Sequence, residues 1–103
     1  MSPSKPIDSF ITFCYTRDIE STASFYGEVL GLDMVLDQGG CRIYRIVGDA
    51  FVGFCNRPGT AEPVGVLLTF VTDDVDGWFE RVKASGAHVD KAPVFNPEYQ
   101  IYH

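Results

Sequence analysis

Residues 7–15 are rich in β-branched and aromatic side chains, and from Ile11 onward large and smaller side chains alternate, which is typical of a β-strand with two unlike faces. The period of two separates large side chains from smaller ones: Ile11, Phe13 and Tyr15 against Thr12, Cys14 and Thr16. A polar, proline-containing leader precedes this run. The pattern therefore predicts a first strand over 7–15.

The next stretch has the spacing of an amphipathic helix. Asp18 can cap its start by accepting hydrogen bonds from the first turn, and Gly31 can end it in the left-handed conformation. The apolar and small residues between them recur every three or four positions, on one side of a helix: Ile19, Thr22, Ala23, Tyr26 and Leu30. We expect a helix from Asp18 to Gly31.

Three short strand patterns follow, separated by turns. The predicted strands are Leu32–Leu36, Cys41–Val47 and Ala50–Cys55. Two glycines stand between the first pair, and Gly48-Asp49 between the second favours a tight hairpin. The first module is therefore strand, helix and three strands.

The start of this module recurs later in the chain. Thr72-Asp73-Asp74-Val75-Asp76 repeats Thr16-Arg17-Asp18-Ile19-Glu20 at an offset of 56 (74 − 18 = 56). The second copy also follows an apolar run and precedes a glycine, Gly86. We therefore predict a tandem repeat of the βαβββ module, an α+β fold in a single domain over 1–103. Module one covers about 7–56, a linker covers 57–63 and module two covers about 64–103.

The second module begins with a more apolar predicted strand, Val64–Thr72, followed by a helix capped by Asp74. The buried side of this helix would carry Val75, Trp78, Phe79 and Val82. We expect a short strand at Ala87–Val89 and an extended segment from Gln100. Compared with module one, part of the third strand and all of the fourth are missing. We therefore expect a natural chain that continues past the last residue.

Composition narrows the possible partners. The 103 residues carry a net charge of −6, and the eight Lys and Arg residues are scattered, which argues against nucleic acid as the main ligand. No apolar run approaches the ~18 residues of a membrane span, and the N-terminus has no hydrophobic signal region. These observations predict no nucleic acid and no membrane partner, and a cytoplasmic protein.

The three cysteines are Cys14, Cys41 and Cys55, an odd number without CxxC spacing. This spacing argues against zinc ribbons and disulfide frameworks. All three lie in apolar strand-like runs. We therefore expect buried free thiols in a reducing compartment.

Residues 18–32 carry a specific resemblance. The run from Asp18 to Tyr26, with Val29-Leu30-Gly31-Leu32, resembles the helix signature D-L-E-x-x-x-x-F-Y-x-x-V-L-G-L of the vicinal oxygen chelate superfamily. That superfamily includes glyoxalase I, bleomycin-resistance proteins and extradiol dioxygenases. The resemblance covers about residues 7–103, although the D-P-x-G-x-x-x-E hairpin that usually ends its members is lacking. It implies two modules whose sheets curl around a cleft.

The resemblance also implies a divalent metal in the enzymes of the superfamily. Their His, Gln or Glu ligands lie near the start of the first strand and the end of the fourth strand of each module. Counting back seven residues from the caps Asp18 and Asp74 gives Ile11 (18 − 7 = 11) and Leu67 (74 − 7 = 67), which are apolar. We therefore expect no cofactor and no metal, unless the natural chain extends past His103.

Without metal ligands, the sequence predicts a cleft lined by apolar and aromatic side chains. Clefts of this kind hold small organic molecules with a few polar groups that fix the orientation. A buried hydroxyl needs a partner, which favours Tyr15 and Thr69, and Arg45 is the candidate for an anionic group. The candidate ligand-binding residues are Phe13, Tyr15, Tyr44, Arg45, Phe54 and Thr69. The alternative is that they form plain core or a dimer contact.

Three functions are compatible with these features. The first is binding of a small, partly aromatic organic molecule without metal, as in bleomycin-resistance proteins. The second is a metal-dependent lyase, isomerase or dioxygenase whose ligands come from a missing C-terminus or a partner chain. The third is an assembly protein with a closed cleft. Unpaired sheet edge and apolar surface favour pairing with another chain, so we also expect a homodimer.

Overall fold

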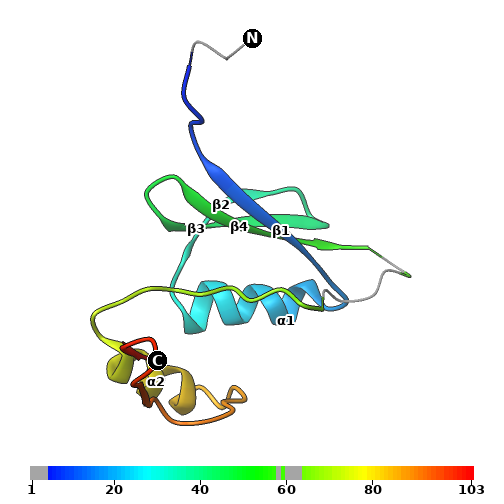
Figure 1. The fold of residues 1–103 in the computed structure, drawn as a ribbon. Helices are drawn as coiled ribbons and strands as arrows, with labels where there is room; N and C mark the ends of the chain where they lie inside the picture. The colour runs from blue at the N-terminus through cyan, green and yellow to red at the C-terminus, as the bar shows by residue number, and fades with distance from the viewer. Residues whose placement is uncertain (1–4, 58, 60–63) are drawn as a thin grey trace. The chain divides into compact units, whose positions relative to one another are not determined.

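The structure, a computed structural model, describes residues 5–57, 59 and 64–103 (Figure 1). The chain divides into two compact units, unit 1 over residues 1–66 and unit 2 over residues 67–103. Most of the predicted linker, residues 58 and 60–63, lies outside the described residues. The domain boundaries read from the sequence stay predictions.

Four strands of unit 1 form one mixed sheet. They are β1 (Phe10–Thr16), β2 (Asp33–Asp37), β3 (Cys41–Val47) and β4 (Ala50–Asn56), in the order β1-β4-β3-β2. β1 runs parallel to β4, and the other neighbouring pairs are antiparallel. Because parallel neighbours need a crossover connection, β1 leads into a helix before the chain returns. The predicted order of strand, helix and three strands is confirmed.

The helix of unit 1 has two parts, α1 (Ile19–Ala23) and the π-helical η1 (Ser24–Val29). The predicted cap is confirmed, because Asp18 Oδ1 accepts a hydrogen bond of 3.1 Å from the Ser21 backbone N–H. The predicted stop is also confirmed, since Gly31 has φ +71°. The wider π turns of η1 are a feature that residue spacing does not predict.

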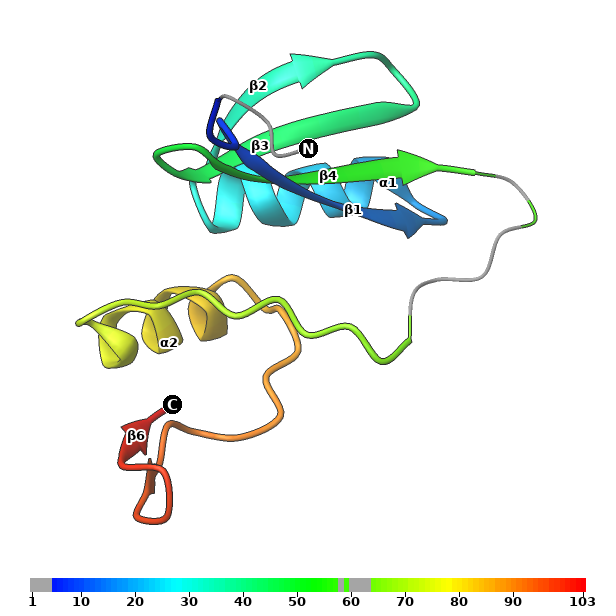
Figure 2. The same ribbon diagram turned by 45° about the horizontal axis from the view of Figure 1, so that its top comes forward.

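Both views of the ribbon show the helix lying along one face of the four-stranded sheet (Figures 1 and 2). We call this side the helix face. Glu20 of the helix forms an ion pair with Arg42 of β3 at 2.7 Å, and this guanidinium holds the pKa of the Glu20 carboxyl below its usual value. The Tyr26 ring lies 4.4 Å from the Phe54 ring. Val52 of β4 is fully buried. The core of unit 1 therefore lies between the helix and β3 and β4.

Unit 2 contains α2 (Val75–Ala84) and a two-stranded hairpin of β5 (Phe95–Asn96) and β6 (Ile101–Tyr102). The predicted cap is confirmed, because Asp74 Oδ1 accepts from the Gly77 backbone N–H at 3.0 Å. The Tyr102 hydroxyl donates to Asp76 Oδ1, and this hydrogen bond raises the pKa of Tyr102.

Two predicted strands of module two are wrong. The structure describes residues 64–72 and 87–89 without strand pairing. Leu67 and Val71 are almost fully exposed. An apolar run becomes a strand only when another strand pairs with it, and none of the described segments pairs with this one. The pattern therefore indicated extended, apolar residues but not their pairing.

None of the helices in the described part of the chain has the length and apolar character that crossing a bilayer requires.

Candidate functional site

The face of the β1–β4 sheet that points away from the helix is the candidate site, and we call it the open face. Residues paired across strands point to the same face, so the ladders define its three rows. From one end of the sheet to the other they are Ile11, Phe51, Arg45 and Asp33; Phe13, Gly53, Ile43 and Leu36; and Tyr15, Cys55 and Cys41. Within unit 1, no helix or strand that the structure describes packs on these rows.

Large apolar side chains are exposed on this face. Ile11 is 40% exposed, Phe13 is 54% exposed and Tyr15 is 39% exposed. All three come from β1, whose alternation gives it one apolar face that the helix does not cover. An exposed apolar cluster of this kind is typical of a binding surface.

Gly53 has no side chain, which leaves room for the Phe13 ring in the middle row of the open face. A Cβ at Gly53 would lie 2.5 Å from Cε1 of the Phe13 ring and 3.4 Å from the Ile43 side chain. The Phe13 ring therefore lies directly over the backbone of β4. Any side chain at position 53 would displace this ring, because the separation is shorter than a van der Waals contact.

Two arginines stack on aromatic rings of the open face. The Arg45 guanidinium carbon lies 5.4 Å from the centroid of Phe51, and that of Arg57 lies 5.2 Å from the centroid of Tyr15. Phe51 belongs to the first row and Tyr15 to the last. The open face thus carries a cation at each end of a central apolar strip. Phe51 and Arg57 are not among the sequence candidates.

The six candidates from the sequence do not lie together. Phe13, Tyr15 and Arg45 share the open face. Tyr44 and Phe54 lie on the helix face, where they are 3% and 5% exposed and pack with the Tyr26 ring. Burial raises the pKa of Tyr44. Tyr44 and Phe54 therefore belong to the core, the alternative to ligand binding that the sequence left open.

The alternation of side chains along a strand predicts that the six candidates cannot all share one face. Tyr44 and Arg45 are neighbours on one strand, so their side chains must point to opposite faces. Phe54 and Gly53 are separated in the same way. Thr69 lies in unit 2 with an exposed side chain, and its part in binding stays a prediction.

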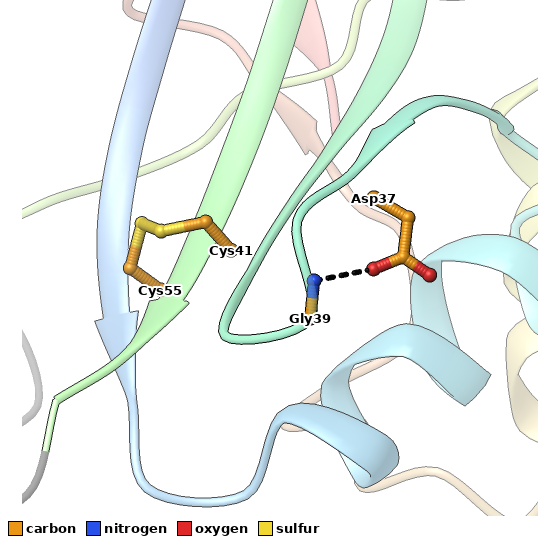
Figure 3. The surroundings of a disulfide bond; sticks show 4 residues. All are labelled: Asp37, Gly39, Cys41 and Cys55. Carbon is orange, nitrogen blue, oxygen red and sulfur yellow. Dashed lines mark hydrogen bonds between the residues drawn. A yellow bond between two sulfur atoms is a disulfide. The ribbon is translucent and has the colours of Figure 1, made fainter.

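Cys41 and Cys55 form a disulfide between β3 and β4, with a Cα–Cα distance of 4.1 Å (Figure 3). The expectation of three free thiols is therefore wrong for these two, whereas Cys14 is free and buried as predicted. Spacing from the Gly48-Asp49 turn alone would place Cys41 opposite Asn56. A register shift between Arg45 and Val47 brings Cys41 opposite Cys55 instead, and residue spacing does not predict that shift.

The metal-ligand positions that the resemblance implies can be compared with the structure. Ile11 lies on the open face, where its side chain cannot coordinate a metal. Cys55, near the end of β4, is held in the disulfide, so it offers no thiolate. Across 5–57, 59 and 64–103, no three His, Cys, Asp or Glu side chains come close enough to hold a metal ion.

The fold has many solved relatives. A bleomycin resistance determinant encoded on the transposon Tn5 is 25% identical, with a TM-score of 0.68 over 93% of this chain and 84% of that chain. A lactoylglutathione lyase from Agrobacterium tumefaciens is 23% identical, with a TM-score of 0.69 over 99% of this chain and 84% of that one. A bleomycin-binding protein complexed with bleomycin is 24% identical, with a TM-score of 0.61 over 95% and 85%.

The comparison with curated proteins gave no match. The family model described as "Glyoxalase/Bleomycin resistance protein/Dioxygenase superfamily" matches residues 9–102, which is nearly the whole chain. That span contains the Asp18–Leu32 helix signature and the whole β1–β4 sheet. The chain therefore belongs to the glyoxalase/bleomycin resistance protein/dioxygenase superfamily.

Proposed function

We propose that this protein binds a small, partly aromatic organic molecule on the open face of the β1–β4 sheet. The observation that carries the proposal is the exposed cluster of Ile11, Phe13 and Tyr15 on the face that the helix leaves free. Aromatic side chains supply large apolar contact areas, and stacking between rings adds to them. The similarity to the bleomycin resistance determinant, at 25% identity, supports a role of this kind.

The proposed mode of action is binding without a metal. Ile11 favours binding without a metal, because this apolar residue stands where the resemblance to the superfamily implies a metal ligand on the first strand. The similarity to a lactoylglutathione lyase is below 25% identity and supports the fold rather than a reaction. A ligand on the open face would be held by ring contacts at its centre and by polar contacts at its ends.

The two arginines favour a ligand with an anionic group. Arg45 and Arg57 have exposed side chains that stack on rings of the open face. Asp33 is the ladder partner of Arg45, but the two form no ion pair. Arg42, in contrast, is paired with Glu20 and Asp37 on the helix face. A carboxylate on an aromatic ligand could therefore pair with Arg45 while its ring contacts Phe13.

Calorimetric titration with naphthoate and with the neutral, similarly shaped naphthamide tests the proposal. We expect both compounds to bind, with naphthoate tighter. In the variant Arg45→Gln, naphthoate should lose about three- to fivefold in affinity, the strength of one exposed ion pair, while naphthamide should be unaffected. Lys5→Gln controls for the change in net charge.

The two parts of the proposal fail in different ways. If neither compound binds, the open face is not a site for small aromatic molecules. If both bind equally and Arg45→Gln changes nothing, the face binds aromatic molecules without selecting for charge.

We also propose that the protein forms a homodimer. Exposed apolar side chains in both units support it, among them Phe13 in unit 1 and Val71 in unit 2. Light scattering at micromolar concentration should give twice the chain mass of 11.4 kDa. A mass equal to one chain would contradict the dimer and leave the open face for ligand alone.

A further inference from the structure

The Cys41–Cys55 disulfide lies on the open face, and the proposed function does not use it. Cys55 is the ladder partner of both Cys41 and Tyr15, so the bridge and the Tyr15 side chain occupy the same row. The bridge lies on the side of the sheet away from the helix, whereas Arg42, the residue after Cys41, forms an ion pair with Glu20 of the helix. The bridge therefore forms part of the surface that a ligand would contact.

The two cysteine residues differ in burial. Cys41 is partly exposed, whereas Cys55 is 8% exposed. A thiolate attacks a disulfide along a path that requires access to the attacked sulfur. The less buried residue, Cys41, is therefore the one where we expect a thiolate to attack, with Cys55 as the leaving group. The remaining thiol, Cys14, is buried on the helix face as the ladder partner of Phe54, so it cannot take part in the exchange.

We propose that the Cys41–Cys55 bridge is a thiol-exchange site, where a low-molecular-weight thiol adds to Cys41 and the adduct covers the ligand-binding surface beside Tyr15. The second half of this proposal rests on the proposed function. In the first step the thiolate RS⁻ attacks Cys41 Sγ, a Cys41–S–S–R bond forms, and the bond to Cys55 breaks to leave the Cys55 thiolate. A second thiol can then release R–S–S–R and leave Cys41 as a thiol.

The geometry explains why the adduct would matter. Cys41 lies two strands from Tyr15, which is about 10 Å at the ordinary spacing of strands in a sheet. A group as large as glutathione on Cys41 can span this distance across Cys55. It would occupy the last row of the open face, where Arg57 stacks on Tyr15. A ligand could then no longer reach that row.

Site mapping tests the exchange. The native, oxidised protein is incubated with reduced glutathione, quenched with acid and mapped by peptide mass spectrometry. We expect the mixed disulfide on Cys41. In matched variants, the Cys41 thiol of Cys55→Ser should react with oxidised glutathione at least about tenfold faster than the Cys55 thiol of Cys41→Ser, since thiol exchange depends on access. An adduct mainly on Cys55 or Cys14, or no adduct without denaturant, would overturn the proposal.

Binding tests the effect of the adduct. In the variant Cys55→Ser the Cys55 thiol, which could displace glutathione from Cys41, is absent, so the adduct is stable. Naphthoate binding can then be compared in the same variant with and without glutathione. We expect the adduct to reduce naphthoate affinity by at least about tenfold. Circular dichroism checks that the adduct leaves the fold intact. Equal affinities would overturn the second half of the proposal. If naphthoate fails to bind even the unmodified native protein, the proposed function fails, and the mapping still decides the exchange site.

Discussion

Phe54→Ala should lower the free energy of unfolding by about 3–5 kcal/mol, the usual cost of removing a buried ring. Phe54 is 5% exposed and its ring contacts the Tyr26 and Tyr44 rings, so the substitution leaves a cavity between sheet and helix. Phe13→Ala is the matched control on the other face of the same sheet. Because Phe13 is 54% exposed, we expect it to lose no more than about 1 kcal/mol.

Urea unfolding followed by circular dichroism measures both values, and naphthoate titration adds the functional contrast. Phe13→Ala should remain folded and bind naphthoate poorly. A conservative variant, Phe54→Leu, should bind it like the native protein, since Phe54 lies on the helix face. Equal stability losses for Phe13→Ala and Phe54→Ala would show that the two faces are assigned wrongly.

Loss of the Cys41–Cys55 bridge is the second large effect that we expect. The bridge joins residues separated by 14 positions, and closing a loop of that size removes about 3 kcal/mol of chain entropy from the unfolded state. Because each kcal/mol shifts the melting temperature of a small domain by about 4–8 °C, the reduced protein should melt more than about 10 °C lower.

The variant Cys41→Ser/Cys55→Ser separates the bridge from other effects of the reductant. Native protein should lose stability when a phosphine reductant is added. The double variant should have the stability of the reduced native protein, with and without reductant. If reduction left the melting temperature of the native protein unchanged, the bridge would not constrain the unfolded chain.

The sequence was sufficient for the starts of both helices because their signals are local. Asp18 and Asp74 each accept from a backbone N–H three positions on, which needs no information from distant residues. Gly31 takes the left-handed conformation at the end of its helix for the same local reason. The family signature adds specificity to this stretch, and the match over residues 9–102 confirms it.

The site was harder to predict because it depends on pairing between strands. Alternation within β1 showed that Phe13 and Tyr15 share a face, but only the register with β3 and β4 shows which of their residues join them. Tyr44 and Phe54 were therefore named as candidates together with Phe13, although they lie on the helix face. Pairing also explains the missed disulfide, as well as the apolar run at 64–72, which has the composition of a strand and no partner among the described segments.

The central claim is that the open face binds a small aromatic molecule, and its most direct test is a naphthoate titration followed by amide and aromatic-ring NMR. Shift changes that saturate and concentrate on Phe13, Tyr15 and Phe51, with Tyr44 and Phe54 unaffected, are the predicted result. Saturating changes centred on Tyr44, Phe54 and the helix, or no saturable change at all, would contradict the claim.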